Sequence, residues 1–213
     1  MSIAIPWDSF DLIVFDMDGT LYDQPPLRRR MAALLAREAI RQRSLSVMRT
    51  LAAFRRQREA MANAVTNDFA VAQYRLPGHS PDAVRATVID WMEQRPLAML
   101  REYRTPGAGT LFTRLARNHA IAIFSDYAAQ AKLAALGLSA RYCVTAEDVG
   151  RLKPDPAGLL WLMEQAKTTP QRTLMIGDRD ERDGEAARRA GVRALIRGRD
   201  FRHFDDPIFR HAS

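Results

Sequence analysis

The stretch FDLIVFDMDGT, residues 10–20, decides the fold of this chain. Its first six residues form a short and mostly apolar run, which is typical of a strand buried in a parallel sheet. Asp16 and Asp18 follow at the end of that predicted strand, and Gly19 allows the chain to turn sharply there. Ligands bind beyond the carboxyl ends of the strands in an open parallel sheet. The two aspartates are therefore the first candidates for a functional site.

Downstream of Thr105 the chain alternates between predicted strands and predicted helices. Strands are predicted at 120–124, 141–144, 173–176 and 192–196, and helices at about 108–117, 127–136, 155–167 and 183–190. Strands that alternate with helices of this length imply right-handed crossovers and parallel strand pairing. The sequence therefore predicts an α/β fold with a doubly wound, Rossmann-like parallel sheet.

Residues 27–104 have a different pattern, which is rich in alanine, leucine, methionine and arginine and poor in strand formers. Apolar residues recur there on one helical face. Ser80 and Pro81 have the pattern of a helix start, with Ser80 as the capping residue. We therefore predict a core domain that is interrupted by an inserted α-helical cap domain. The predicted ranges are residues 1–22 and 105–213 for the core and residues 23–104 for the cap.

The composition is that of a globular chain with a sizeable core. Of its 213 residues, 47% are hydrophobic and 27% are charged, which is close to the averages for globular proteins. No run approaches the roughly 18 apolar residues of a membrane helix, and the first ten residues lack the pattern of a signal peptide. We expect a cytoplasmic protein without a membrane partner. The single cysteine, Cys143, excludes an internal disulfide, and its strand-like surroundings favour a structural role.

The net charge of +7 is concentrated in one segment. Residues 24–104 hold 15 arginines, no lysine and 7 acidic residues, whereas the rest of the chain holds 17 basic and 18 acidic residues. Such an excess favours an anionic partner. The arginines at 28–30 and at 55, 56 and 58 fit polar helix faces without interleaved aromatic residues, so we do not expect nucleic acid. Arg28 to Arg30 are the first candidates for holding an anionic part of a substrate.

Further polar residues follow the other predicted strands. They are Ser125 after the strand 120–124, Lys153 in a loop before Pro154, and Asp178 and Asp183 after the strand 173–176. Clustered carboxylates repel one another unless a cation lies among them, and oxygen ligands suit Mg²⁺. A lysine and a hydroxyl can hold phosphate oxygens, and a carboxylate can attack phosphorus. This set of residue types therefore favours phosphate chemistry with a metal ion.

The order of these residues resembles the four motifs of the haloacid dehalogenase (HAD) superfamily. The matching segments are Asp16 to Thr20, Ser125, Lys153-Pro154, and Gly177-Asp178 with Asp183. The predicted helical insert also lies where that family places a cap, between its first and second motifs. The resemblance covers nearly the whole chain and points to the phosphoglycolate-phosphatase-like branch with a helical cap.

The resemblance implies a role for each matching residue. Asp16 would be the nucleophile and a metal ligand, and Asp18 the general acid/base whose backbone carbonyl also binds the metal. Lys153 would pair with Asp16 and with the phosphate. Ser125 would bind the phosphoryl group, and Thr20 would help to position Asp18 or the phosphate. Asp178 would bind Mg²⁺, and Asp183 would either bind the metal or orient its waters.

Asp18 distinguishes two branches of the family. The dehalogenases need no metal, and they do not keep an acid at this position. A halide leaving group, unlike an alkoxide, needs no proton donor. The resemblance therefore implies a Mg²⁺-dependent phosphatase that hydrolyses a small phosphomonoester through an aspartyl-phosphate on Asp16. A phosphomutase with the same site and a non-catalytic anion-binding protein with a basic cap stay open as alternatives. Asp126 replaces the Asn or Ser often found in such phosphatases, which leaves the substrate open.

The remaining polar and aromatic residues are assigned to structure rather than to chemistry. Three acids, Asp126, Asp180 and Glu181, are interpreted as solvated loop charges. The four histidines show no ligand spacing, and we assign none to a metal. The aromatic residues of 201–213 are expected to pack on the core or on a second subunit. We expect a small phosphorylated metabolite as the partner and a monomeric or homodimeric protein.

Overall fold

The computed structural model describes residues 5–62 and 68–212. Within these ranges, five parallel strands form one sheet in the order β3-β2-β1-β4-β5. Their bounds are Leu12–Phe15 for β1, Ala120–Ser125 for β2, Tyr142–Thr145 for β3, Thr173–Gly177 for β4 and Arg193–Ile196 for β5. Because β1 is central and the chain crosses to either side of it, the predicted doubly wound parallel sheet is confirmed.

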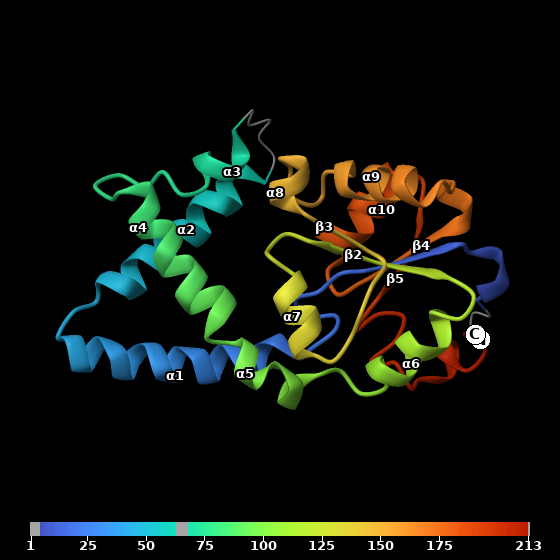
Figure 1. Ribbon diagram of the computed structural model, residues 1–213, viewed down its shortest axis with the longest axis horizontal. Coiled ribbons are helices and arrows are strands. Elements are labelled where there is room, and N and C mark those ends of the chain that lie inside the picture. Colours follow the sequence, from blue (N-terminus) through green and yellow to red (C-terminus); the bar gives the residue numbers. More distant parts are fainter. Residues whose placement is uncertain (1–4, 63–67, 213) are drawn as a thin grey trace.

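The helices fall into two groups, one in the insert after β1 and one around the sheet. The insert contains α1 (Gln24–Gln42), α2 (Ser46–Met61), α3 (Phe69–Ala72), α4 (Pro81–Val88), the π-helical segment Ile89–Gln94 and α5 (Leu97–Leu100). The helices around the sheet are α6 (Ala108–Leu115), α7 (Gln130–Ala135), α8 (Ala146–Val149), α9 (Ala157–Ala166) and α10 (Glu185–Arg189). Figure 1 shows α9 and α10 on one side of the sheet and α6 on the other.

The central strand β1 is buried on both faces, which explains its almost continuous apolar sequence. Its side chains alternate between two apolar layers. Ile13 and Phe15 pack in the layer that contains α6, whereas Leu12 and Val14 pack in the layer that contains α9 and α10. Both faces of the sheet are thus covered. A ligand is therefore expected at the carboxyl ends of the strands.

The predicted strands are present to within two residues at each end, but two helix starts differ. The helix predicted over 127–136 begins at Gln130, three residues late. The helix predicted over 183–190 begins instead as a π-helical segment, Asp180–Gly184, which precedes α10. The reason is the side chain of Asp183, which turns inward. Its Oδ2 accepts hydrogen bonds from the backbone N–H groups of Asp178 (3.1 Å) and Arg179 (3.0 Å).

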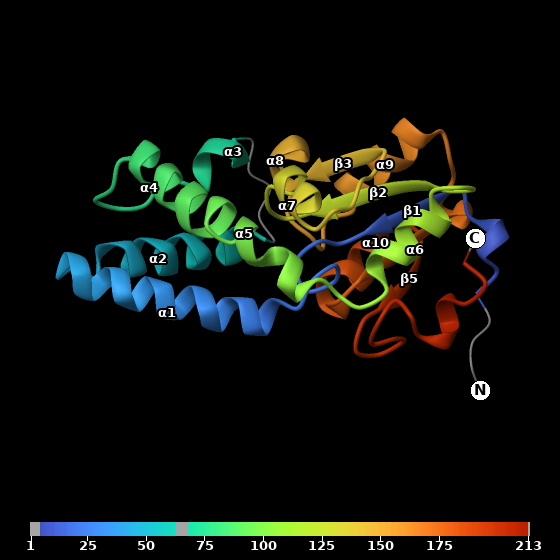
Figure 2. The same ribbon diagram turned by 60° about the horizontal axis from the view of Figure 1, so that its bottom comes forward.

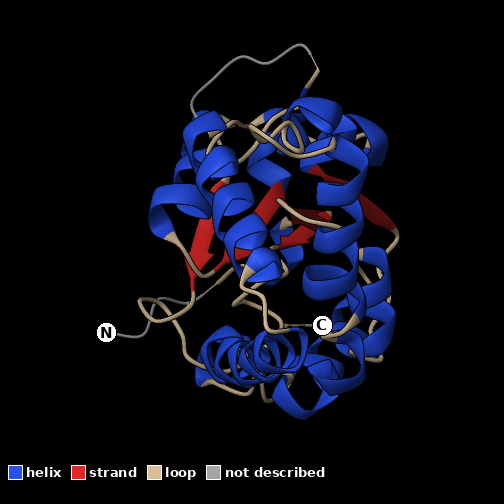
Figure 3. Cartoon of the chain, turned by 90° about the vertical axis from the view of Figure 1, so that its left-hand side faces the viewer, coloured by secondary structure: helices blue, strands red, loops and turns tan. Residues whose placement is uncertain are grey.

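The inserted helices form a layer of their own beyond the carboxyl ends of the strands. Figure 2 shows the strand arrows pointing toward α1, α2 and α4, and Figure 3 views this layer from its outer side, in front of the strands. The buried residues that hold the layer together are Leu51, Phe54, Tyr74, Leu76, Val84, Val88 and Trp91. Burying an apolar side chain of this size contributes roughly 1.5–3 kcal/mol. The insert therefore has an apolar core separate from the two layers at the sheet.

Helix α4 starts at Pro81 as predicted, but Ser80 does not cap it in the predicted way. Although Ser80 occupies the N-cap position, its side chain makes no capping hydrogen bond to the residues that the structure describes. Ser80 is exposed, so water can take that bond.

The C-terminal segment packs on the core, which is one of the two predicted outcomes. Phe201, Phe204 and Phe209 are buried in the apolar layer beside α6. Cys143 is half-buried on β3, and burial raises the pKa of its thiol, which suits the structural role expected for it. In the parts of the chain described here, no helix is both long enough and apolar enough to cross a membrane.

Candidate active site

The strand ends bring Asp16, Lys153 and Asp183 together in a buried group. The backbone N–H of Asp16 donates to the carbonyl of Ile176 at 2.8 Å, which fixes the aspartate beside β4. The Nζ of Lys153 contacts Oδ1 of Asp16 and donates to Oδ1 of Asp183 at 2.6 Å. Burial alone would lower the pKa of Lys153, but the charges of the two aspartates raise it. The lysine therefore carries a fixed positive charge next to Asp16.

The loop after β1 holds Asp16 from its other side. Oγ1 of Thr20 donates to Oδ2 of Asp16 at 3.1 Å, so both carboxylate oxygens have a partner. Gly19 has a φ of +102°, and a Cβ at this position would collide with the carboxylate of Asp178. Glycine is therefore required for the turn and for the close approach of Asp178.

Three carboxylates form a cluster that fits a cation. One oxygen from each of Asp16, Asp178 and Asp183 lies within 4.8 Å of the other two. Within the described residues, Oδ1 of Asp178 is buried and has no hydrogen-bond partner. Burial and the charge of Asp183 raise the pKa of Asp178 to about 6, and burial also raises the pKa of Asp16. A cation would favour the ionised form of both groups, and carboxylate oxygens are ligands that Mg²⁺ prefers.

Asp18 is bound by two residues that the sequence analysis did not select. Its Oδ1 accepts hydrogen bonds from Nζ of Lys132 at 2.6 Å and from the hydroxyl of Tyr22. Burial would raise the pKa of Asp18, but these donors hold it below its usual value. The sequence contains a signal for Lys132, because only three of its 32 basic residues are lysines and another of these is Lys153.

Ser125 lies at the same end of the sheet but outside this hydrogen-bonded group. It ends β2, the strand next to β1, and its side chain is buried. Its Oγ accepts a hydrogen bond from the backbone N–H of Tyr127 at 3.2 Å. One residue before Ser125, the carbonyl of Phe124 accepts a hydrogen bond from Nζ of Lys153 at 3.2 Å.

Asp126 is not the solvated loop charge that the sequence suggested. It is buried, and its Oδ1 accepts a hydrogen bond from the backbone N–H of Lys153 at 2.9 Å. This bond ties the loop after β2 to the loop that carries the lysine. No local pattern encodes it, since the two residues are 27 positions apart.

Arg58 is likewise not on a polar helix face as predicted. It is buried, and its guanidinium donates to the backbone carbonyl of Asp126 and to the side chain of Gln73. It also lies 4.3 Å from the ring centroid of Tyr127, an aromatic contact that the sequence analysis missed. Arg58 therefore links the insert to the loop after β2.

Two further contacts join the insert to the part of the chain around the sheet. Arg182 donates to Glu59 of α2 at 2.5 Å and to the backbone carbonyl of Lys153 at 2.6 Å. Glu147 of α8 accepts hydrogen bonds from Gln73 at 2.5 Å and from Tyr74 at 2.9 Å. The insert is thus held against the site end of the sheet.

A cavity of about 480 Å³ lies between the first-motif aspartates and the insert. Asp16 and Asp18 line it at one end, and helices α1 and α2 line it at the other. Of the arginines predicted to face a substrate, Arg28 lines this cavity. Arg30 does not fit that prediction, because it pairs with Glu102 at 2.8 Å on the exposed surface.

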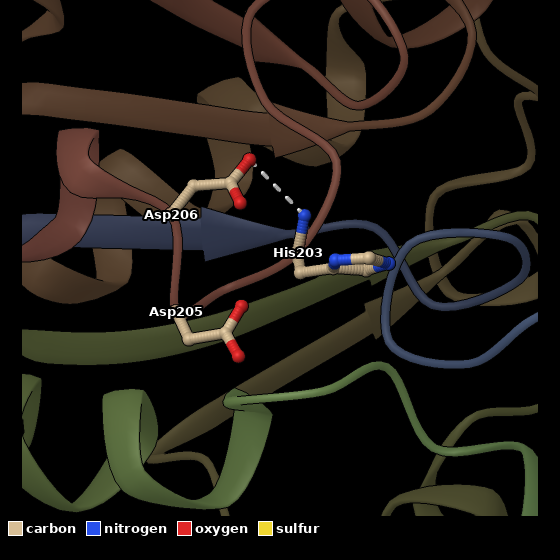
Figure 4. A group of neighbouring side chains, drawn as sticks. All are labelled: His203, Asp205 and Asp206. Carbon is tan, nitrogen blue, oxygen red and sulfur yellow. Dashed lines mark hydrogen bonds between the residues drawn. The ribbon is translucent and has the colours of Figure 1, made fainter.

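A second group of possible metal ligands lies in the C-terminal segment after β5. Figure 4 shows His203, Asp205 and Asp206 close together on one loop. The carboxylate of Asp206 accepts hydrogen bonds from the backbone N–H groups of Arg202 (2.7 Å) and His203 (3.3 Å). This carboxylate therefore stabilises its own turn, and we assign no metal to the group.

The comparisons with known proteins identify the family. A family model described as haloacid dehalogenase-like hydrolase matches residues 10–191. Because this match spans most of the chain, the chain belongs to the haloacid dehalogenase-like hydrolase family, as the motifs predicted.

Similar proteins include both phosphatases and a dehalogenase. Phosphoglycolate phosphatase 1 of Pseudomonas aeruginosa (strain PAO1) is 27% identical over 207 residues, which cover 90% of this chain and 71% of that protein. Phosphoglycolate phosphatase of Pseudomonas putida (strain KT2440) is 40% identical over 55 residues, which cover 26% of this chain and only 20% of that protein. The crystal structure of 2-haloacid dehalogenase from Pseudomonas syringae pv. tomato DC3000 has a TM-score of 0.64 at 22% identity, over 93% of this chain and 90% of that chain. These similarities support the fold and the hydrolase family, and they leave the reaction to be argued from the site.

Proposed function

We propose that this chain is a Mg²⁺-dependent phosphatase that hydrolyses a small-molecule phosphomonoester through an aspartyl-phosphate on Asp16. The observation that carries the proposal is the position of Asp16. It lines the cavity, contacts the ammonium of Lys153, and lies in a carboxylate cluster with Asp178 and Asp183. A carboxylate beside a fixed positive charge and a cation site is equipped to attack phosphorus and to neutralise the transferring group.

The two aspartates of the first motif share the chemical steps. A carboxylate oxygen of Asp16 forms a bond to phosphorus while the bond from phosphorus to the leaving oxygen breaks. Protonated Asp18 gives its proton to the leaving oxygen, which departs as an alcohol. Ionised Asp18 then takes a proton from water, whose oxygen attacks the phosphorus, restores Asp16 and releases inorganic phosphate. Tyr22 and Lys132 favour the ionised form of Asp18 that this second step needs, and the proton taken from water returns Asp18 to the protonated form that the first step uses.

The other motif residues hold the metal and the phosphoryl group in this proposal. The side chains of Asp16, Asp178 and Asp183 and the backbone carbonyl of Asp18 would hold Mg²⁺. When bound, the ion supplies positive charge that neutralises oxygens of the phosphoryl group. Lys153 supplies a second positive charge, and the hydroxyl groups that bind or position the phosphate belong to Ser125 and Thr20.

The helical insert serves as a cap in this proposal. We divide the chain into a core domain, residues 1–22 and 105–213, and a cap domain, residues 23–104. A cap over the strand ends excludes bulk water from the reacting group and contacts the leaving group. The small phosphorylated metabolite, the cytoplasmic location and the monomeric or homodimeric state stay predictions.

Hydrolysis of p-nitrophenyl phosphate tests the proposal directly. The purified chain is assayed with Mg²⁺, with EDTA, and as the Asp16→Asn variant. We expect activity that requires both the metal and Asp16. Activity that survives Asp16→Asn would refute the nucleophile assignment. Mg²⁺ binding without turnover of any compound in a broad phosphate panel would favour the anion-binding alternative, and return of the phosphoryl group to a sugar phosphate would identify a mutase.

A further inference from the structure

The cavity extends well beyond the reacting carboxylates. Its volume is about 480 Å³, and it reaches from Asp16 and Asp18 to α1, α2 and the π-helical segment of the insert. Pockets of about 300–1,000 Å³ are typical for drug-sized ligands. A phosphate with a two-carbon leaving group, as in the phosphoglycolate named for the curated relatives, would leave most of this space to water.

Part of the cavity wall is apolar. Its apolar residues come from segments far apart in the sequence: Leu27, Met31 and Leu35 of α1, Leu51 of α2, Trp91 of the π-helical segment and Leu152. The three residues of α1 are spaced four apart and therefore share one helix face. Apolar surface of this kind gains free energy when an apolar group, rather than water, covers it.

Most charged residues around the cavity already have a partner within the chain. The pairs are Lys132 with Asp18, Arg182 with Glu59, and Arg58 with the backbone carbonyl of Asp126. Arg179 lies 3.9 Å from the carboxylate of Asp126. Arg28 of α1 and Arg55 of α2 also line the cavity, and both are exposed. The part of the wall that offers no charge to a ligand is therefore the one formed by the apolar side chains of α1, α2 and the π-helical segment.

We infer that the substrate is a phosphomonoester whose leaving alcohol carries an apolar body of several carbon atoms. The inference rests on the phosphatase function proposed above and specifies its substrate class. The phosphate lies at Asp16, and the apolar body covers the surface formed by α1, Leu51 and Trp91. A short polar alcohol makes none of these apolar contacts, so it gains no binding free energy from them.

A series of alkyl phosphates tests this inference, because its members share the charge and the reacting centre and differ in apolar length. Ethyl, butyl, hexyl and octyl phosphate are assayed with Mg²⁺ and the full chain. We expect kcat/KM to rise about two- to fourfold for each methylene group added until the cavity is filled.

Two neighbouring alanines on α1 provide matched variants for the location of the apolar body. Both are exposed, but only Ala32 lines the cavity, whereas Ala33 faces elsewhere. In Ala32→Trp the indole occupies part of the cavity, so the octyl-to-ethyl ratio of kcat/KM falls at least about tenfold. Ala33→Trp keeps the ratio of the unmodified chain.

Each outcome of the experiment decides for or against the inference. A flat or falling series, with hydrolysis of ethyl phosphate that requires Asp16, overturns the inference and leaves the phosphatase function standing. An octyl-to-ethyl ratio that Ala32→Trp leaves unchanged overturns the location of the apolar body. Absence of Asp16-dependent hydrolysis with every alkyl phosphate and with p-nitrophenyl phosphate overturns the proposed function, and the inference falls with it.

Discussion

The two ends of the cavity are built from opposite kinds of contact. At the strand ends, buried charges contact one another, as Lys153 does with Asp16 and Asp183. On the insert side, Leu51 and Trp91 line the cavity and belong to the apolar core of the insert. Removing one partner of a buried charge pair is strongly destabilising, whereas apolar surfaces tolerate substitutions that conserve volume. The strand ends therefore restrict the chemistry, and the insert is free to vary with the substrate.

The largest effect on activity is expected for Lys153, whose ammonium contacts both Asp16 and Asp183. Lys153→Met removes the positive charge beside Asp16, and we expect kcat/KM for p-nitrophenyl phosphate to fall by about 10³-fold or more. Lys167→Met is the matched control, because Lys167 is exposed at the end of α9 and does not line the cavity. Wild-type activity in Lys153→Met would show that the buried positive charge at the strand ends is not needed for the reaction.

The next effect concerns stability where the two regions meet. Arg58→Ala leaves the buried carbonyl of Asp126 and the side chain of Gln73 without their donor, so we expect the free energy of unfolding to fall by about 2–4 kcal/mol. Urea denaturation measures this change. Arg56→Ala, an exposed neighbour, should change it by less than about 0.5 kcal/mol. Equal effects of the two variants would show that Arg58 is an ordinary surface arginine, as the sequence alone suggested.

The buried position of Arg58 also separates what can be predicted from the sequence from what cannot. The α/β fold was predictable because β1 is continuously apolar and helices alternate with strands at regular spacing. The grouping of the motif residues at one end of the sheet was predictable, because all of them except Lys153 come soon after a strand and parallel strands bring their carboxyl ends to one edge.

Contacts between the insert and the loops were not predictable in the same way. Arg58 and Asp126 are 68 positions apart, and each carries a charge that local patterns assign to solvent. Their burial depends on how the insert docks, which neither helical periodicity nor turn chemistry encodes. Lys132 is an intermediate case. Lysines are rare in this chain, which makes Lys132 noticeable in the sequence, but its hydrogen bond to Asp18 cannot be predicted from the sequence.

A smaller effect is expected at the hydrogen bonds to Asp18. Tyr22→Phe removes a hydroxyl donor to Asp18 without changing the shape of the side chain, so we expect kcat to fall about 10- to 30-fold. Tyr142→Phe on β3 is the control, since Tyr142 lies on an outer strand of the sheet. If both variants retain full activity, the contact between Tyr22 and Asp18 does not contribute to the reaction.

The smallest effect is a pH dependence of metal binding at the carboxylate cluster. The pKa of Asp178 is raised to about 6, and Mg²⁺ binds the ionised carboxylate, so protons compete with the metal below that pH. Mg²⁺ affinity, measured by calorimetry, should therefore weaken about fourfold between pH 7 and pH 5.5. Asp180→Asn should keep both the affinity and its pH dependence, because the carboxylate of Asp180 pairs with Arg188 and Arg199 outside the cluster. An affinity that does not change over this pH range would mean that Asp178 is not a ligand or that its pKa is not raised, and the charge repulsion attributed to the strand ends would lose its support.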